Sequence, residues 1–292
     1  MEVFVRQSSN YFSPLRYPGG KSSLGAFLGE VISQNNLHNY TYVEPFAGGA
    51  GAALNLLFLE KIKSIHINDF DKAIYSIWYS ILNYTERFVN KIRNTEVSLD
   101  EWHRQKEIYN SNTKSIFKLG FATFYLNRTN RSGIITGGPI GGMTQAGKYK
   151  IDVRYNKERL IKRVKKIAAY KNRIKITNED GINLINSLDH SKHFYYIDPP
   201  YYVKGEGLYL NHFEARDHQN LSDCLNNICD AFWILTYDNV EEISSLYLDR
   251  LTVSFSLNYY AGDVKKGKEI MVFSDAINDV IHPGDKQLSF FD

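Results

Sequence analysis

A proline-rich quartet, Asp198-Pro199-Pro200-Tyr201, follows an apolar run at residues 193–197 and carries the groups needed to hold a planar base by its amino group. Such an amine is a poor nucleophile because its lone pair is delocalised into the ring, so an enzyme that alkylates it must bind both of its hydrogens. The Asp198 carboxylate and the Pro199 carbonyl can each accept one. The prolines preset the direction of that carbonyl, and Tyr201 can stack on the base. The alternative is an ordinary exit from a strand into a loop.

A glycine-rich turn is the second chemical element. Residues 42–46 have the pattern of a strand, residues 47–51 (AGGAG) that of a tight turn, and residues 52–59 that of a helix. Glycines let a cofactor approach the backbone, and the helix N-terminus offers free amides. The dinucleotide-binding spacing G-x-G-x-x-G is absent, so this turn indicates a cofactor site of another kind.

Two aspartates follow later strand patterns. Asp69 ends the pattern at residues 64–69, a place where an acid commonly binds the ribose hydroxyls of a nucleoside cofactor. The alternative for Asp69 is a surface acid that caps the next helix. Asp180 is a weaker candidate for the adenine end of the cofactor, and a helix N-cap is equally consistent with its position.

The segment at residues 15–23, LRYPGGKSS, superficially looks like a phosphate-binding loop. The first glycine of that motif would fall at Leu15, and no strand pattern precedes it, which argues against a nucleoside triphosphate site. For Lys21 alone, the alternative to a functional role is a solvated lysine after a turn.

Taken together, these segments resemble the DNA N6-adenine methyltransferases of the Dam type, the alpha group. The resemblance rests on their order: RYPGGK at 16–21, EPFAGG at 44–49, a long insert, and DPPY at 198–201. It extends over residues 15–274, and further matching stretches are 125–128, 154–156, 259–262 and 268–269. The family motif has glycine where this chain has Ala50, followed here by Gly51. The insert also differs from that of the enzymes that read GATC, so no target sequence is carried over.

The resemblance implies S-adenosylmethionine as methyl donor and direct in-line transfer to N6 of an adenine flipped out of duplex DNA. It makes Asp198, Pro199 and Tyr201 the catalytic residues. The predicted cofactor-binding residues are Tyr17, Lys21, Glu44, Phe46, Gly48, Asp69, Asp180 and Asp198.

Alternating strand and helix patterns predict an α/β fold with an open, mainly parallel sheet covered on both faces. Seven strand patterns lie at residues 42–46, 64–69, 173–177, 194–198, 232–236, 251–257 and 269–274. Ligands of such sheets bind at the carboxyl ends of the strands, where Phe46, Asp69 and Asp198 fall. We therefore predict a Rossmann-like S-adenosylmethionine-dependent methyltransferase sheet of about seven strands with an inserted, mostly helical target-recognition domain.

The predicted catalytic domain comprises residues 1–70 and 156–292, and the insert residues 71–155. The insert ends in a glycine-rich loop at 129–150 that is rich in groups suited to base edges and phosphates. The predicted DNA-binding residues are Asn127, Arg128, Arg131, Ser132, Lys148 and Arg154. A stretch at 202–216 after the quartet is a candidate lid over the base, and a plain mobile loop is the alternative.

Charge is unevenly distributed. The net charge is only +3, yet residues 157–175 are dominated by lysine and arginine and contain a single acid, Glu158. Apolar residues recur there at helical spacing, which predicts a helix with one apolar and one basic face. The basic face is either simply solvated or, in a DNA-modifying enzyme, follows the phosphates.

Composition excludes several classes of protein. The chain is 43% hydrophobic but has no apolar stretch long enough to span a membrane and no signal peptide, which predicts a cytoplasmic protein. The resemblance implies a bacterial or phage origin. Cys224 and Cys229 do not follow proline or lie in a cofactor loop, which argues against a cysteine nucleophile. No Cys/His cluster predicts a metal site. We expect a monomer acting on double-stranded DNA without a membrane partner, and a cognate restriction endonuclease acting separately is a candidate partner.

Three alternatives stay open at this point. Methylation of cytosine N4 presents a similar amino group, although the motif order and Asp198 favour adenine. A DNA-binding relative without catalysis would fail to bind the cofactor, and the intact quartet and glycine turn argue against it. An RNA or protein methyltransferase would share the sheet and the cofactor, but the long insert favours DNA.

Overall fold

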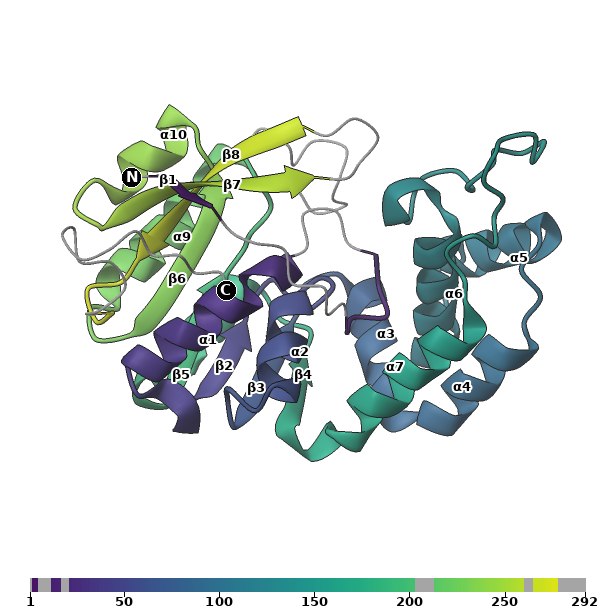
Figure 1. Cartoon of the computed structure of the whole chain (residues 1–292), viewed down its shortest axis with the longest axis horizontal. Helices are drawn as coiled ribbons and strands as arrows, with labels where there is room; N and C mark the ends of the chain where they lie inside the picture. The colour runs from purple at the N-terminus through teal and green to yellow at the C-terminus, as the bar shows by residue number, and fades with distance from the viewer. Residues whose placement is uncertain (1, 5–11, 17–20, 203–212, 260–264, 278–292) are drawn as a thin grey trace.

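The computed structural model describes residues 2–4, 12–16, 21–202, 213–259 and 265–277 of the 292-residue chain (Figure 1). Tyr17 and most of the predicted lid lie outside these residues. Two parts are visible in Figure 1: a twisted sheet with its covering helices on the left, and a group of helices on the right.

One sheet of eight strands organises the described chain, in the order β1-β7-β8-β6-β5-β2-β3-β4. The strands are β1 (Glu2–Phe4), β2 (Thr41–Glu44), β3 (Ser64–Asn68), β4 (Ile174–Thr177), β5 (His193–Ile197), β6 (Phe232–Asp238), β7 (Thr252–Tyr259) and β8 (Lys265–Phe273). Strand β8 is antiparallel to both of its neighbours, and the other pairs are parallel. The predicted α/β fold with a mainly parallel sheet is confirmed. Strand β1 was not predicted, because three residues are too few for a periodic pattern.

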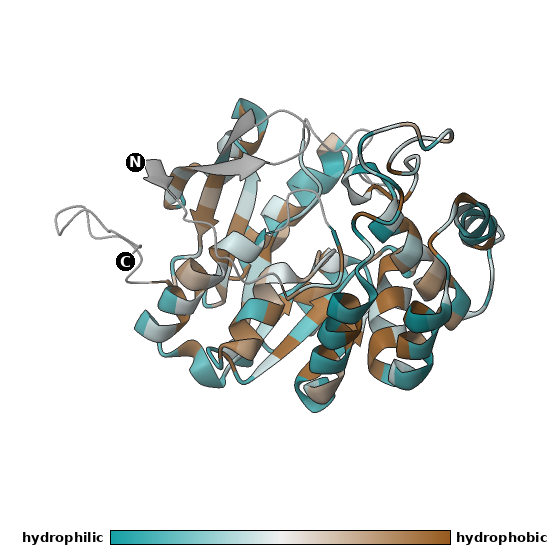
Figure 2. Ribbon diagram, turned by 45° about the vertical axis from the view of Figure 1, so that its right-hand side comes forward, coloured by the Kyte–Doolittle hydropathy of each residue, from teal (hydrophilic) through white to brown (hydrophobic). Residues whose placement is uncertain are grey.

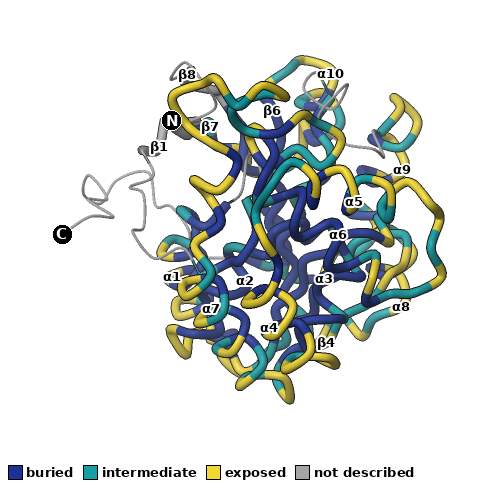
Figure 3. The backbone as a smooth tube through the Cα atoms, turned by 90° about the vertical axis from the view of Figure 1, so that its right-hand side faces the viewer, coloured by how far each residue is buried: buried dark blue, intermediate teal, exposed yellow. Residues whose placement is uncertain are grey.

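Alternating side chains of the central strands supply two hydrophobic cores, one on each face of the sheet. Tyr42 and Phe194 belong to the first core, with α1 (Gly25–Gln34) and α2 (Gly51–Phe58). Their sequence neighbours Val43 and Tyr195 belong to the second. The helices that pack there are α8 (Gly181–Ser187), α9 (Ala215–Asn227) and α10 (Glu241–Ser244). Figures 2 and 3 show the result: apolar, buried strands enclosed by helices whose outer faces are polar and exposed.

The helices on the right of Figure 1 lie between β3 and β4 in the sequence. They are α3 (Lys72–Asn83), α4 (Thr85–Asn94), α5 (Leu99–Asn110) and α6 (Ile116–Thr129), followed by a loop and then α7 (Lys157–Ala169). Their apolar side chains, such as Phe88 and Phe124, belong to the same core cluster as Tyr42 of the sheet. The insert is therefore packed continuously against the catalytic part rather than joined by a free linker.

No helix within the described segments is long and apolar enough to cross a membrane.

Helices α3 and α6 approach closely at Gly120. A Cβ atom at this position would lie 2.2 Å from the carbonyl oxygen of Ser76 and 2.8 Å from Ser80 Oγ. The first of these contacts is with backbone, which has no flexible end that could move away.

We expect Gly120→Ala to lower the free energy of unfolding by about 1–3 kcal/mol, because overpacking outweighs the higher helix propensity of alanine. Chemical denaturation of the purified variant measures this change. Gly138→Ala is the matched control, since a Cβ atom there meets nothing within 4 Å. Equal stabilities of the two variants would contradict the close packing of α3 on α6.

Candidate active site

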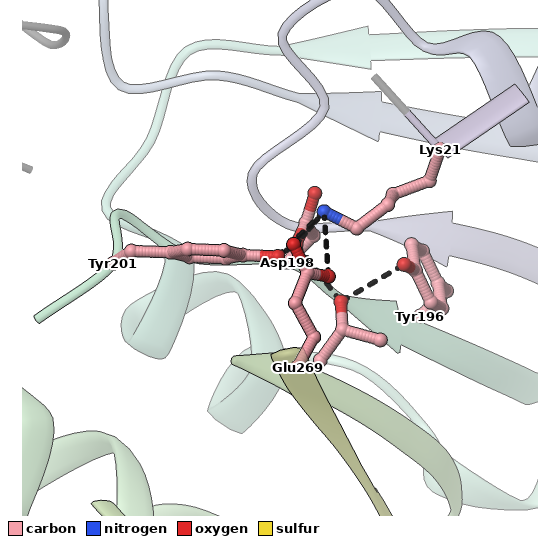
Figure 4. Close-up of polar contacts among 6 residues, drawn as sticks. Lys21, Tyr196, Asp198, Tyr201 and Glu269 are labelled. Carbon is pink, nitrogen blue, oxygen red and sulfur yellow. Dashed lines mark hydrogen bonds and ion pairs between the residues drawn. The ribbon is translucent and has the colours of Figure 1, made fainter. Parts of the chain in front are cut away.

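Asp198 lies directly after β5 and is held through one oxygen of its carboxylate (Figure 4). Its Oδ1 accepts a hydrogen bond of 2.8 Å from Thr236 Oγ1 and one of 3.3 Å from the Tyr201 hydroxyl, and it lies 3.0 Å from Lys21 Nζ. Within the described residues, Oδ2 makes no hydrogen bond or ion pair. The carboxylate is thus oriented by three partners while its second oxygen stays available to a ligand.

Lys21 is a buried cation at the start of a short 3-10 helix, Lys21–Leu24, and only 4% of its side chain is exposed. Its Nζ donates a hydrogen bond of 2.6 Å to the Tyr201 hydroxyl and lies 3.6 Å from Glu269 Oε2. Burial alone would lower the pKa of Lys21, but the Asp198 and Glu269 carboxylates outweigh it and raise the pKa above its usual value. The alternative of a solvated lysine is therefore wrong.

Glu269, Thr236 and Tyr196 complete this network, and none of them was predicted as a site residue. Glu269 is fully buried on β8, and the Tyr196 hydroxyl lies 2.9 Å from Thr236 Oγ1. A signal for Glu269 exists, because an acid that opens an otherwise apolar strand needs a partner when buried. Thr236 and Tyr196 carry no comparable signal, since both residue types are common in strands.

Tyr201 of the quartet is 8% exposed, and its ring centroid lies 6.2 Å from that of Tyr237. Its hydroxyl connects Lys21 to Asp198, so the ring is fixed relative to the carboxylate. Pro199 is buried, whereas Asp198 and Pro200 line a neighbouring cavity. The structure thus brings the quartet to the edge of a ligand-sized space.

The cavity has a volume of about 250 Å³ and lies where the strands end. Its wall includes the segments around Leu15 and Lys21, the glycine turn, the ends of β3 and β5, the start of α8, and the insert loop at Gly133–Thr136. Of the predicted cofactor-binding residues, those that line it are Lys21, Glu44, Phe46, Asp69, Asp180 and Asp198. Gly48 adjoins it through Asp69, and Asp180 is also the N-cap of α8, accepting a hydrogen bond from Asn183 N.

The glycine turn contains two residues with a left-handed backbone conformation. Gly48 and Ala50 both have left-handed conformations, with φ of 46° and 47°. The left-handed conformation costs alanine about 1–2 kcal/mol, whereas glycine adopts it freely. This explains why the family motif has glycine at the position of Ala50. Gly51 is favoured for a different reason, because a Cβ atom there would lie 2.2 Å from Ser22 Oγ and 3.3 Å from Ser22 N.

Asp69 closes the turn against the end of β3. Its Oδ2 accepts a hydrogen bond of 2.8 Å from Gly48 N, and its Oδ1 one of 2.9 Å from Asp71 N. Burial and the adjacent Asp71 raise the pKa of Asp69 to about 7. The N-cap of α3 is Asp71, so the alternative that Asp69 caps this helix is wrong. Each Asp69 oxygen keeps a second lone pair for a ligand hydroxyl.

Glu44 is a second buried carboxyl group in the cavity wall, 5% exposed. Its Oε1 accepts hydrogen bonds of 2.9 Å from Ala53 N and 3.1 Å from the Tyr42 hydroxyl. Burial raises the pKa of Glu44 to about 8, and Asp198 adds to the rise while the two hydrogen bonds oppose it.

The predicted DNA-binding residues are not all accessible. Arg131, Ser132, Lys148 and Arg154 are exposed, and Arg128 is half-buried. Asn127 is only 1% exposed, and its amide is bonded to the backbone of Arg16 and Gly133. The Asn127 side chain thus anchors the insert loop at the cavity wall, and its contact with DNA stays a prediction.

The predicted basic helix corresponds to α7, and several of its cations already have protein partners. Lys157 Nζ donates to the carbonyl of Arg93, and Arg163 Nη1 donates to the carbonyl of Ser13. Arg173, just beyond the helix, pairs with Glu60 at 2.7 Å. Only part of this basic surface is thus free for another ligand.

Among the described residues, no group of three or more His, Cys, Asp or Glu side chains could hold a metal ion.

A protein-family model matches most of this chain. The model is that of the D12 class N6 adenine-specific DNA methyltransferases, and it matches residues 17–262. This range contains the glycine turn, the insert and the quartet. No curated protein matches the chain significantly.

Solved structures with a similar fold include two that cover most of this chain. A proposed RNA methyltransferase from Pyrococcus horikoshii, PH1948, has 12% identity and a TM-score of 0.41, with 95% of this chain and 92% of that chain covered. SMU.472, a proposed methyltransferase complexed with SAH, has 9% identity and a TM-score of 0.38, with 87% and 52% covered. At these identities and TM-scores the likeness carries no information on substrate or activity.

The raised pKa of Glu44 makes stability depend on pH. An unfolded glutamate ionises near pH 4.3, whereas folded Glu44 keeps its proton to about pH 8. Between these values the unfolded chain binds fewer protons, so the contribution of Glu44 to stability is lost as pH rises through this window.

We therefore expect Glu44→Gln, which cannot ionise, to raise the Tm at pH 9 by on the order of 5 °C relative to the unaltered protein. At pH 5 the difference should be small. Calorimetry of both proteins across this range measures it, with exposed Glu86→Gln as control. A Tm difference that does not change with pH would contradict the burial of an ionisable Glu44.

Proposed function

Because the chain belongs to the D12 class N6 adenine-specific DNA methyltransferase family, as predicted from its motifs, we propose that it methylates N6 of an adenine extruded from duplex DNA, with S-adenosylmethionine as donor. One observation carries the proposal. The Asp198 carboxylate is fixed through Oδ1 at the wall of a cavity that also contains the glycine turn.

The cavity residues fit such a donor. Asp69 retains lone pairs for ribose hydroxyls, and Phe46 offers an aromatic wall beside Asp180. A ligand can approach the backbone at Gly49 because the turn carries no bulky side chains there. When bound, the donor supplies an electrophilic methyl group on a positively charged sulfur.

The quartet would orient the amine. Asp198 Oδ2 and the Pro199 carbonyl each accept one hydrogen of the amino group, which directs its nitrogen toward the methyl group. Transfer would break the sulfur–methyl bond of the donor as the nitrogen–carbon bond forms, which leaves a neutral thioether and a positively charged nitrogen. That nitrogen would then release one proton to solvent. The cluster of Lys21, Asp198 and Glu269 contains one cation and two carboxylates, and this excess of negative charge stabilises the developing charge.

Residues 71–155 would form the target-recognition domain, and residues 1–70 and 156–292 the catalytic domain. Ile134 and Thr136 of the insert loop line the cavity, so the part that would read DNA also forms a wall of the catalytic space. Asn130 holds this loop through hydrogen bonds of 2.9 Å to the carbonyls of Ile134 and Ile135. Exposed Arg131 and Lys148 are suited to base edges and phosphates.

The direct test is to incubate the purified protein with radiolabelled S-adenosylmethionine and unmethylated genomic DNA and to identify the labelled nucleoside. We expect label in N6-methyladenine, at one short sequence that long-read sequencing maps. Label in N4-methylcytosine, or none in DNA despite cofactor binding, would overturn the proposal.

We expect Asp198→Ala to lower kcat by at least about a hundredfold, because it removes an acceptor that orients the reacting amine. DNA affinity should stay within about twofold, since the residue lies in the cavity wall. Single-turnover methylation and DNA titration measure the two effects. Asp223→Ala, which removes an exposed acid from α9, is the control. An Asp198→Ala variant with normal turnover would refute the assignment.

A further inference from the structure

Four arginines from separate segments converge beside the cavity. Arg16 lies at the end of the segment 12–16, Arg128 on α6, Arg154 in the loop before α7, and Arg163 on α7. Burial lowers the pKa of Arg16, and the charge of Arg154 adds to this effect. Burial likewise lowers the pKa of Arg128 to about 9, with further contributions from the other three arginines. The charges of Arg16, Arg154 and Arg163 therefore lie close enough to Arg128 to repel its charge.

These guanidinium groups are held by backbone carbonyls. Arg16 Nη1 donates to Asn130 O at 2.8 Å, Arg163 Nη1 to Ser13 O at 2.8 Å, and Arg128 Nε to Arg154 O at 2.8 Å. No ion pair with a carboxylate is recorded for any of the four within the described residues. Each guanidinium has five N–H donors, so most donors in the cluster remain unused.

The cluster is fixed to the cavity wall. Asn127 of the wall accepts a hydrogen bond of 2.8 Å from Arg16 N and donates one of 2.7 Å to Arg16 O. Gly133, also in the wall, approaches so closely that a Cβ atom there would lie 2.3 Å from Arg16 O. Figure 1 shows the segment that ends at Arg16 running between the sheet and the insert helices. An anion bound here would lie beside the space that is to receive the base.

We propose that Arg16, Arg128, Arg154 and Arg163 form a binding site for one phosphate group, that of the DNA backbone next to the extruded nucleotide. Arg16, Arg128 and Arg163 are half-buried and Arg154 is exposed beside them. Like charges in such a partly buried place without a counter-ion are unfavourable unless a ligand neutralises them. The planar guanidinium forks match the tetrahedral oxygens of a phosphate. The inference rests on the proposed function. It adds that the N-terminal segment and the insert bind the same DNA strand.

Titration of a fluorescent 30-base-pair duplex over a range of salt concentrations tests the site without requiring methylation. Arg154→Gln and Arg163→Gln should each weaken binding about tenfold, equally for all sequences, and reduce the slope of log Kd against log salt by about 1. Donor binding should be unchanged. Arg154 is the safer change, because its side chain is exposed and donates no recorded hydrogen bond.

Arg87→Gln on α4 is the matched control, since it removes an exposed arginine that packs on Phe117 away from the cluster. Variants with the parental slope and affinity would overturn the inference while leaving the proposed function intact, whereas failure of the parental protein to bind any duplex would reject both. Stabilisation of the parental protein by inorganic phosphate or pyrophosphate, lost in the variants without any change in DNA binding, would assign the site to a free phosphate instead.

A scan of duplexes with single methylphosphonate linkages then locates the contact. In the parental protein, neutralising one linkage beside the methylated adenine should weaken binding, and in Arg163→Gln the same substitution should have little further effect. If the loss of affinity from each methylphosphonate simply adds to the loss from Arg163→Gln at every linkage, Arg163 contacts no phosphate.

Discussion

The ion pair between Lys21 and Asp198 constrains the whole site, because a buried ammonium group is tolerated only beside carboxylates. Lys21 comes from the N-terminal part of the chain, Asp198 from the end of β5 and Glu269 from β8. Satisfying one cation therefore fixes the positions of three distant segments. It also fixes Tyr201, whose hydroxyl lies between the two members of the pair.

The glycine turn is subject to a second constraint, which is steric rather than electrostatic. The segment that carries Lys21 packs directly on the start of α2, where Gly51 leaves no room for a side chain. Asp69 holds the same turn from the other side through Gly48. The turn is thus fixed by its neighbours before any ligand arrives, which is the preorganisation that a methyl transfer over a short distance requires.

The sequence predicted what depends on local pattern. Glu44, Asp69 and Asp198 each end an apolar run, and the parallel order of β2, β3 and β5 brings such positions to one edge of a sheet. Pairing across the sheet was not predictable: Glu269 reaches Lys21 only because β8 runs antiparallel between β6 and β7. Asn127 fits a DNA contact by type, but the residues that surround it make it a buried anchor. Such outcomes depend on tertiary contacts that periodicity does not encode.

The antiparallel position of β8 also has a consequence for biosynthesis. Ribosomes deliver the chain from its N-terminus, so Lys21 and Asp198 are available well before the strand that carries Glu269. Contacts between distant segments form late because loop closure must precede them. The charge balance of the site is therefore completed only when nearly all of the sheet is in place, and a nascent or partly folded chain lacks the finished catalytic network.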